Sequence, residues 1–285
     1  MNKTLCATAL LAMTGAAFAG SIDGANFGAD YGPALWSQNV GTQFGNNTDA
    51  SVDFANGSEI DALYGSISGT TLFLGVAGNL ETNFNKLNIV LDYASGGQNT
   101  LSGLANLGNL DGLTFDTGFE ADAVLSFTSG NNPIEWYVDG SLADGTGGFL
   151  GGGAVSGPLT VQLAGADITF SQDNSNVGGV GNLGDPFDSD PASVTTGVEI
   201  AIDLGALGWD GVTPINIAGW VNGGGNDFLS NQVIGGLPDG TGNLGAPSGV
   251  DFNQFAGNQF ITIPTPGTLG LVGLAGFAAI RRRRA

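Results

Sequence analysis

The stretch Lys86–Tyr93, KLNIVLDY, decides the fold class of this chain. Its apolar positions 87, 89 and 91 alternate with positions 88, 90 and 92. A period of two residues predicts a β-strand with one buried face. The stretch 198–203, VEIAID, has the same alternation and predicts a second strand of this kind.

Further strand candidates lie on both sides of these two stretches. Segments Glu59–Ser68 and Thr71–Ala77 predict a hairpin that turns at Gly69. No run of ten or more residues has strong helical periodicity. Shorter strand candidates complete the set: Phe119–Phe127, Glu135–Val138, Leu159–Leu163, Ile168–Phe170, Ile215–Val221 and Gln259–Ile263. We therefore expect an all-β fold, an antiparallel β-sandwich of jelly-roll type, over residues 20–263.

Glycine is abundant, at 51 of 285 residues, which is well above the usual share of about 7%. Because 42% of the residues are hydrophobic, we expect a folded chain with glycines in turns and long loops rather than a disordered one. The stretches Ala143–Gly157 and Val221–Pro247 are interpreted as surface connectors. Gly151–Gly153 and Gly223–Gly225 are interpreted as linkers or turns, since the lysine of a phosphate-binding loop is missing.

Residues 1–19 have the features of a secretory signal peptide, with Lys3 before an apolar segment. Ala17 and Ala19 form a small-residue cleavage motif, so we expect signal peptidase to cut after Ala19. The only cysteine of the chain lies inside this segment. The processed chain is therefore expected to be exported and to have no thiol chemistry.

The charge between the two ends is almost entirely negative. All 26 acidic residues lie within positions 23–251, and Lys86 is the only basic residue in that span. Such a surface repels nucleic acid, so we expect no nucleic-acid partner. The chain has no histidine, which together with the missing cysteine excludes a Ser-His-Asp triad, a Cys-His dyad and an ordinary zinc site.

Calcium is the cofactor for which the sequence offers ligands, because calcium prefers several oxygen atoms from a flexible loop. The candidate ligands are Asp173, Asp185, Asp188 and Asp190. Their spacing does not match an EF-hand loop. A structural calcium ion and a solvated acidic turn are the two interpretations of these segments.

A carbohydrate-binding surface needs an exposed aromatic side chain with polar groups beside it. Trp136 and Tyr137 are adjacent, so on a strand their side chains point to opposite faces and one of them can be exposed. They are our candidate sugar platform. The enzymatic alternative is a glycoside hydrolase with paired carboxylates, for which Glu59, Glu120 and Glu135 are candidates.

The C-terminal residues 264–285 have three parts. Pro264-Thr265-Pro266 comes first, an uncharged run of residues 267–280 follows, and Arg281-Arg282-Arg283-Arg284 comes near the end. As a helix the run would span roughly 21 Å, which is short of the ~30 Å hydrocarbon core of a bilayer. We expect a transient membrane anchor with its arginines on the cytoplasmic side.

This order of parts resembles the PEP-CTERM sorting signal, in which Thr265 stands where the family has glutamate. The resemblance implies that an exosortase-like membrane peptidase is a partner and acts near Pro264 and Pro266. The body is similar to secreted proteins of planctomycete-type bacteria that carry such a tail and have no assigned activity. The segments that carry this second resemblance are Gly118-Phe119-Glu120-Ala121-Asp122 and Val221-Asn222-Gly223-Gly224-Gly225.

Residues 21–93 resemble family-9 carbohydrate-binding and DOMON-like sandwiches. Ile22-Asp23-Gly24, the acidic pair in Gly57–Asp61, and the strands Thr71–Glu81 and Leu87–Asp92 carry the resemblance. We therefore expect a secreted, non-enzymatic protein of the cell surface or extracellular matrix that binds exopolysaccharide, with calcium as a cofactor. The alternatives are the glycoside hydrolase and a self-assembling structural surface protein.

Overall fold

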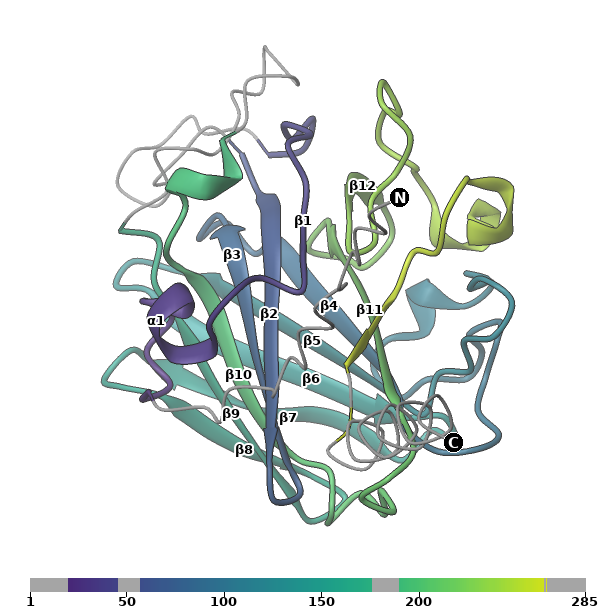
Figure 1. The fold of residues 1–285 in the computed structure, drawn as a ribbon, viewed down its shortest axis with the longest axis horizontal. Helices are drawn as coiled ribbons and strands as arrows, with labels where there is room; N and C mark the ends of the chain where they lie inside the picture. The colour runs from purple at the N-terminus through teal and green to yellow at the C-terminus, as the bar shows by residue number, and fades with distance from the viewer. Residues whose placement is uncertain (1–19, 46–56, 176–189, 264, 266–285) are drawn as a thin grey trace, which may run out of the picture.

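The computed structural model describes residues 20–45, 57–175, 190–263 and 265, and these residues form two antiparallel β-sheets packed face to face (Figure 1). The predicted all-β sandwich is confirmed. The expected signal helix and the C-terminal apolar helix lie outside the described residues. No helix among the described residues is long and apolar enough to span a membrane.

Each sheet is built from strands that are distant in the sequence. The first sheet has the order β1 (Trp36–Ser37), β2 (Glu59–Ser68), β3 (Thr71–Asn79), β10 (Gly197–Asp203), β9 (Ala166–Gln172), β8 (Leu159–Leu163). The second sheet has the order β12 (Leu229–Val233), β11 (Ile215–Asn222), β4 (Lys86–Asp92), β5 (Ala123–Gly130), β6 (Glu135–Leu142), β7 (Gly147–Ala154), with β13 (Ile261–Ile263) also paired to β11.

The helical segments are short. They are α1 (Phe27–Tyr31) and the 3₁₀ turns η1 (Gly108–Leu110), η2 (Pro191–Ser193), η3 (Pro247–Gly249) and η4 (Phe252–Gln254). The sequence pattern did not predict α1, because five residues are too few to show a helical period.

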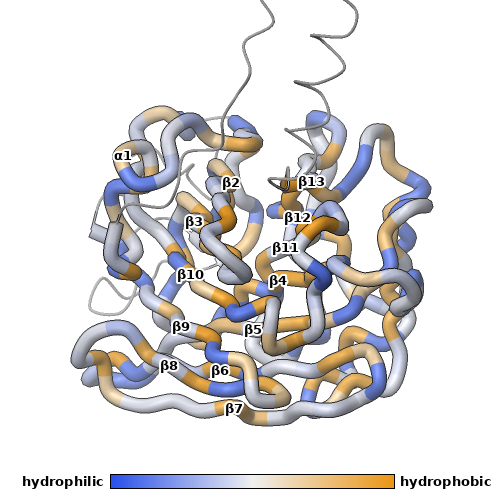
Figure 2. The backbone as a smooth tube through the Cα atoms, turned by 60° about the horizontal axis from the view of Figure 1, so that its bottom comes forward, coloured by the Kyte–Doolittle hydropathy of each residue, from blue (hydrophilic) through white to orange (hydrophobic). Residues whose placement is uncertain are grey.

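The two stretches with the clearest alternation become the inner strands β4 and β10. The predicted hairpin is also confirmed, since β2 and β3 pair and turn at Gly69 and Thr70. Figure 2 shows how apolar and polar segments alternate along the strands of both sheets. Side chains at alternate positions of the two sheets meet in one core, where Phe127 of β5 stacks on Phe170 of β9 with ring centroids 5.0 Å apart.

Part of the outer face of the second sheet is also buried. Val90 of β4 and Trp220 of β11 are both fully buried in a second apolar cluster. The loop between β4 and β5 supplies much of this cluster through five leucines and two phenylalanines, Phe115 and Phe119. The expectation of a single buried face for KLNIVLDY was therefore wrong. Its physical reason is that a long loop folds back over the sheet, which the period of a strand cannot reveal.

Two glycine-rich stretches expected to be connectors contain strands. Gly147–Ala154 forms the edge strand β7, and Leu229–Val233 forms β12. The interpretation of Gly151–Gly153 as a linker was wrong, because an edge strand needs only backbone hydrogen bonds to its neighbour and glycine leaves no side-chain pattern. Gly223–Gly225 does lie at a turn, as predicted.

The N-terminal segment is fixed to the first sheet by one buried carboxylate. Glu199 of β10 is fully buried, and its Oε2 accepts hydrogen bonds from the backbone N–H groups of Asp23 (2.8 Å) and Gly24 (2.9 Å). Its Oε1 accepts a hydrogen bond from the Tyr31 hydroxyl at 2.9 Å. Phe27 of α1 packs over Gly75, where a Cβ would lie 2.7 Å from its ring. The Ile-Asp-Gly segment is thus a structural anchor.

The second apolar cluster leads to a testable prediction. Phe115 is 1% exposed and packs against Phe119, Trp220 and Phe252. Phe115→Ala should lower the free energy of unfolding by about 3–5 kcal/mol, the usual cost of truncating a buried phenylalanine. Urea unfolding followed by tryptophan fluorescence measures it. The exposed control Val212→Ala should stay within about 0.5 kcal/mol of the wild type.

The Glu199 anchor predicts a pH effect. Burial raises the pKa of Glu199, and the hydrogen bonds from Gly24, Asp23 and Tyr31 offset part of that rise. A raised folded-state pKa means that stability falls as pH rises from the ordinary value of 4.5 through the folded value. Glu199→Gln cannot ionise, so its unfolding free energy relative to the wild type should increase from about pH 4 to about pH 7. An unchanged difference between the two proteins across this range would contradict the assignment.

Candidate functional site

The uncovered part of the second sheet's outer face forms an open groove. Lys86 of β4, Thr128 of β5 and Tyr137 of β6 lie directly opposite one another on neighbouring strands, so their side chains share this face. The groove has a volume of about 380 Å³. Its lining residues are Phe84, Lys86, Thr128, Tyr137, Asp139, Phe149 and Gly224.

Three aromatic rings form a row in this groove. The ring centroids of Phe84 and Tyr137 are 6.3 Å apart, and those of Tyr137 and Phe149 are 6.5 Å apart. Phe84 is 42% exposed and Phe149 is 60% exposed, which makes them two of the most exposed large apolar side chains among the described residues. Exposed apolar side chains that lie together on a protein surface are typical of interaction sites, and aromatic rings present flat apolar faces.

Glycines beneath the rings make this arrangement possible. A Cβ added to Gly130 would lie 2.5 Å from the Phe84 ring, and one added to Gly152 would lie 2.5 Å from Cδ1 of Tyr137. Both rings therefore rest on bare backbone. Neither glycine has the positive φ that would require glycine for backbone reasons. Because glycine has no Cβ, these two positions leave space for the two rings.

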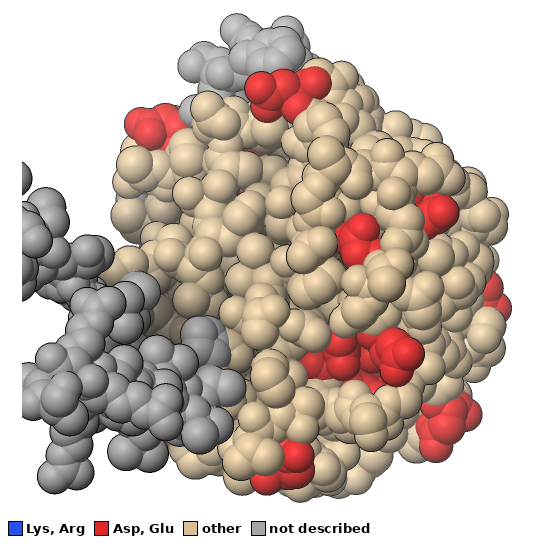
Figure 3. Space-filling view, turned by 45° about the vertical axis from the view of Figure 1, so that its right-hand side comes forward, with Lys and Arg blue, Asp and Glu red and all other residues tan. Residues whose placement is uncertain are grey.

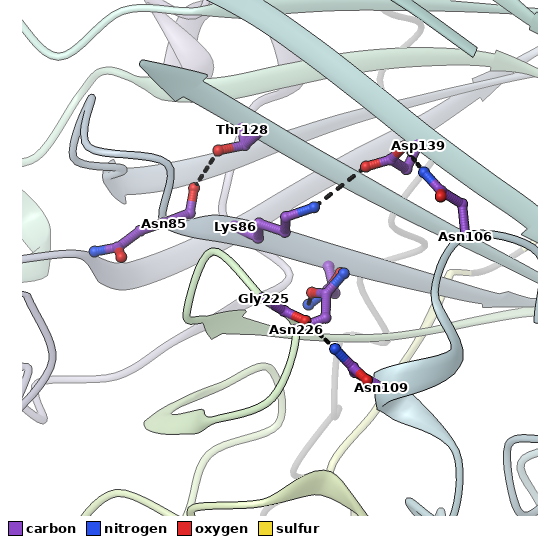
Figure 4. Close-up of polar contacts among 9 residues, drawn as sticks. Asn85, Lys86, Asn106, Asn109, Thr128, Asp139, Gly225 and Asn226 are labelled. Atoms are coloured by element: carbon purple, nitrogen blue, oxygen red, sulfur yellow. Dashed lines mark hydrogen bonds and ion pairs between the residues drawn. The ribbon is translucent and has the colours of Figure 1, made fainter. Parts of the chain in front are cut away.

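Polar groups line one side of the row. Lys86 Nζ contacts Asp139 Oδ2 at 3.2 Å, and both side chains are largely buried. Asn106 donates to the other carboxylate oxygen at 2.6 Å (Figure 4). Lys86 is the only lysine or arginine in the described part of the chain. Acidic side chains are scattered over the face shown in Figure 3. The positive charge of Lys86 therefore sets this groove apart from the rest of the described surface.

Hydrogen bonds from asparagine side chains connect the segments around the groove. Asn109 of η1 donates to the carbonyl of Gly225 at 2.8 Å, and Asn88 of β4 donates to Asn226 at 3.1 Å (Figure 4). Thr128 donates its hydroxyl to the carbonyl of Asn85 at 2.7 Å. These contacts connect three parts of the chain: the loop between β4 and β5, the turn that follows β11, and β4 itself. They lie where the buried part of the outer face ends and the groove begins.

The middle ring of the row, Tyr137, takes part in a small hydrogen-bond network. The Tyr137 hydroxyl donates to Glu135, and Asn131 donates to both groups. The hydrogen bond from Tyr137, followed by that from Asn131, lowers the pKa of Glu135. A general acid of a glycosidase needs a raised pKa, so the surroundings of Glu135 do not suit it to that role.

The structure separates the two predicted platform residues. Trp136 is 6% exposed and packs edge-on against Phe170 in the inter-sheet core, at a centroid distance of 5.1 Å. Its ring is therefore not available as a surface platform, and this part of the prediction is corrected. Tyr137 points outward into the groove, as one member of the pair was expected to, because neighbours on a strand face opposite sides.

The predicted calcium ligands are described only in part. Asp185 and Asp188 lie outside the described residues. Asp173 accepts a hydrogen bond from the Ser175 N–H at 2.7 Å, and Asp190 precedes η2. Among the described residues no group of three or more potential metal-ligating side chains is arranged to hold an ion. The calcium site stays a prediction.

The processing motifs fall mostly outside the described part. Ala17, Ala19, Pro264, Pro266 and the four arginines all lie in the ranges that the structure does not describe. Thr265 is described and buried, and its hydroxyl donates to the carbonyl of Val212 at 3.0 Å.

Sequence reasoning did not find Phe84 and Phe149. Phe84 lies in a turn with a φ of 72°, and Phe149 lies in a glycine-rich stretch that was interpreted as a loop. The available signal was a phenylalanine in a polar or glycine-rich stretch: Phe84 lies between Asn83 and Asn85, and Phe149 follows two glycines.

Comparisons of the chain with protein-family models, with curated proteins and with solved structures find no match.

A pair of neighbouring glycines tests the support of the aromatic row. An added Cβ at Gly152 would lie 2.5 Å from the Tyr137 ring and 2.6 Å from the Trp136 carbonyl oxygen, so Gly152→Ala should force both to move. We expect the free energy of unfolding to fall by about 1–3 kcal/mol, as overpacking does. The matched control is Gly153→Ala in the same strand, where an added Cβ meets nothing within 4 Å. Urea unfolding and near-ultraviolet circular dichroism report the two effects. Equal behaviour of both variants would show that Gly152 does not support the ring.

Proposed function

We propose that this chain is an exported, non-enzymatic protein of the cell surface or extracellular matrix that binds polysaccharide in the groove on its second sheet. The observation that supports the proposal is the row Phe84, Tyr137 and Phe149, in which Phe84 and Phe149 are exposed and Tyr137 is partly exposed. The rings of Phe84 and Tyr137 rest on glycines. A sugar ring has a flat apolar face that suits such a row, and hydroxyl groups at its edge that need polar partners. Asp139, Asn131 and Glu135 are polar groups in reach of the row.

The charge of the groove favours a neutral glycan. Lys86 is held by Asp139, so it offers no free cation for a uronic acid. The rest of the body is strongly acidic, and its field repels polyanions. This field does not repel a neutral chain of hexoses, whereas it would repel an acidic polysaccharide before contact.

Export and sorting complete the proposal. The signal peptide motif at Ala17 and Ala19 brings the chain to signal peptidase. The tail that begins at Pro264 provides a transient membrane anchor and a site for an exosortase-like peptidase. The predicted calcium ion at the loop after β9 would serve as a structural cofactor. Once the tail has been removed, the acidic body would remain with the extracellular polysaccharide.

Binding to immobilised glycans tests the proposal. Affinity electrophoresis in neutral and in uronic-acid polysaccharides should show retardation by a neutral polymer only. Tyr137→Ala and Phe149→Ala should each weaken binding about tenfold or more, because loss of a central aromatic contact costs more than about 1 kcal/mol.

The control variant is Val212→Ala, which removes a side chain of similar exposure (59%) outside the groove lining. It should bind as the wild type does. Retardation that all three variants share equally would place the binding site elsewhere. Release of reducing sugar from a bound polymer would support the hydrolase in place of the binding protein.

A further inference from the structure

The first described residue of the chain lies against a carboxylate. A Cβ added to Gly20 would lie 2.4 Å from Oδ2 and 2.6 Å from Oδ1 of Asp30, which is at the end of α1's first turn. Any larger residue would displace this carboxylate. A Cβ on Gly20 and its backbone nitrogen would share one Cα, so the nitrogen is two bonds from the position that makes this close approach.

The surroundings of Asp30 are acidic and lack a cation. Burial, and then the charge of Asp23, raises the pKa of Asp30. Asp23 also acts on Glu199 of β10, and the Tyr31 hydroxyl lies between these groups. Lys86, the only described lysine or arginine, pairs with Asp139 on the other sheet. The carboxylates near Gly20 therefore have no partner of opposite charge among the described side chains.

Processing would supply the missing charge. Signal peptidase is expected to cut between Ala19 and Gly20. Hydrolysis of this peptide bond adds one water, leaves a carboxylate on Ala19 and creates an α-amine on Gly20. An α-amine has an ordinary pKa of about 7.7–8.0, so it is largely protonated at neutral pH. Before the cut, the same nitrogen belongs to a neutral amide.

We propose that the α-ammonium group of Gly20 in the processed chain is the ion-pair partner of Asp30. Removal of the signal peptide then places a cation at the acidic end of the first sheet, next to the segment that Glu199 anchors. This inference rests on export of the chain and not on glycan binding in the groove. It also gives a reason for glycine at position 20, where the amine must approach the carboxylate closely.

The ion pair has a defined pH dependence. A carboxylate partner raises the pKa of an amine, so the stabilisation is fully present below the amine's ordinary pKa and is lost as pH rises through its raised folded-state value. Asp30 of α1 faces this position, and its titratable neighbours are Asp23 of the N-terminal segment and Tyr31 of α1. Glu199 of β10 interacts in turn with Asp23 and Tyr31. All of them are acidic and would act in the same direction on the amine.

The test compares two forms of the chain that starts at Gly20 and runs to its last residue. One form has a free α-amine and the other is acetylated at this amine. At pH 6.5 and low salt, the free form should melt roughly 1–4 °C higher, as expected for an ion pair in a protein of this size. The difference should vanish in Asp30→Asn and persist in the control Asp239→Asn, which changes an exposed aspartate in another loop.

Two further outcomes decide the proposal. The difference between free and acetylated forms should disappear at a pH above the amine's raised pKa, and the amine should react with acetic anhydride at a higher pH than a free glycine peptide does. Mass spectrometry of the exported chain should show Gly20 as its first residue. Equal melting of the two forms, a difference that survives Asp30→Asn, or another first residue would overturn the inference.

Discussion

Burial of β4 on both of its faces is the constraint on which the rest of the structure depends. One face meets the other sheet in the inter-sheet core, and the opposite face at Val90 meets the leucine-rich loop that follows the strand. Because that loop must satisfy its own backbone while it lies on the sheet, it spreads over only part of the surface. The other part, beginning at Lys86, stays open. The groove is therefore the part of the outer face that the second apolar cluster does not cover.

The open part of the sheet differs from the covered part in how its glycines are used. Under the cover, large apolar side chains such as Trp220 fill the space. In the groove, Gly130 and Gly152 leave space that the rings of Phe84 and Tyr137 occupy from above. An edge strand as poor in side chains as β7 contributes little to a core, yet its glycines leave space for an aromatic ring such as that of Tyr137. This is the physical reason why the glycine content and the binding proposal belong together.

Positive charge is scarce in the described part of the chain, where Lys86 is the only lysine or arginine. Lys86 forms an ion pair with Asp139 inside the groove. This pair connects β4 to β6 across β5, and the two charges nearly cancel. At the other sheet, buried Glu199 is stabilised by two backbone N–H groups and a tyrosine hydroxyl in place of a cation. Backbone dipoles substitute for basic side chains there, which allows an acidic protein to bury a carboxylate. The same scarcity is the reason why the α-amine that we propose for the processed chain would matter more than in an ordinary protein.

The sequence by itself determined the strands whose side chains alternate, such as β4 and β10, and the turn at Gly69, because a period of two and a glycine turn are local properties. It also determined which catalytic chemistries are excluded, because the absence of histidine and the small number of lysines can be counted directly in the sequence. Tertiary structure alone decided that Trp136 is core and Tyr137 is surface, that Gly147–Ala154 is a strand, and that Phe84 and Phe149 lie beside Tyr137. These features depend on which strands become neighbours and where a loop covers a sheet, and no local pattern in the chain encodes such long-range contacts.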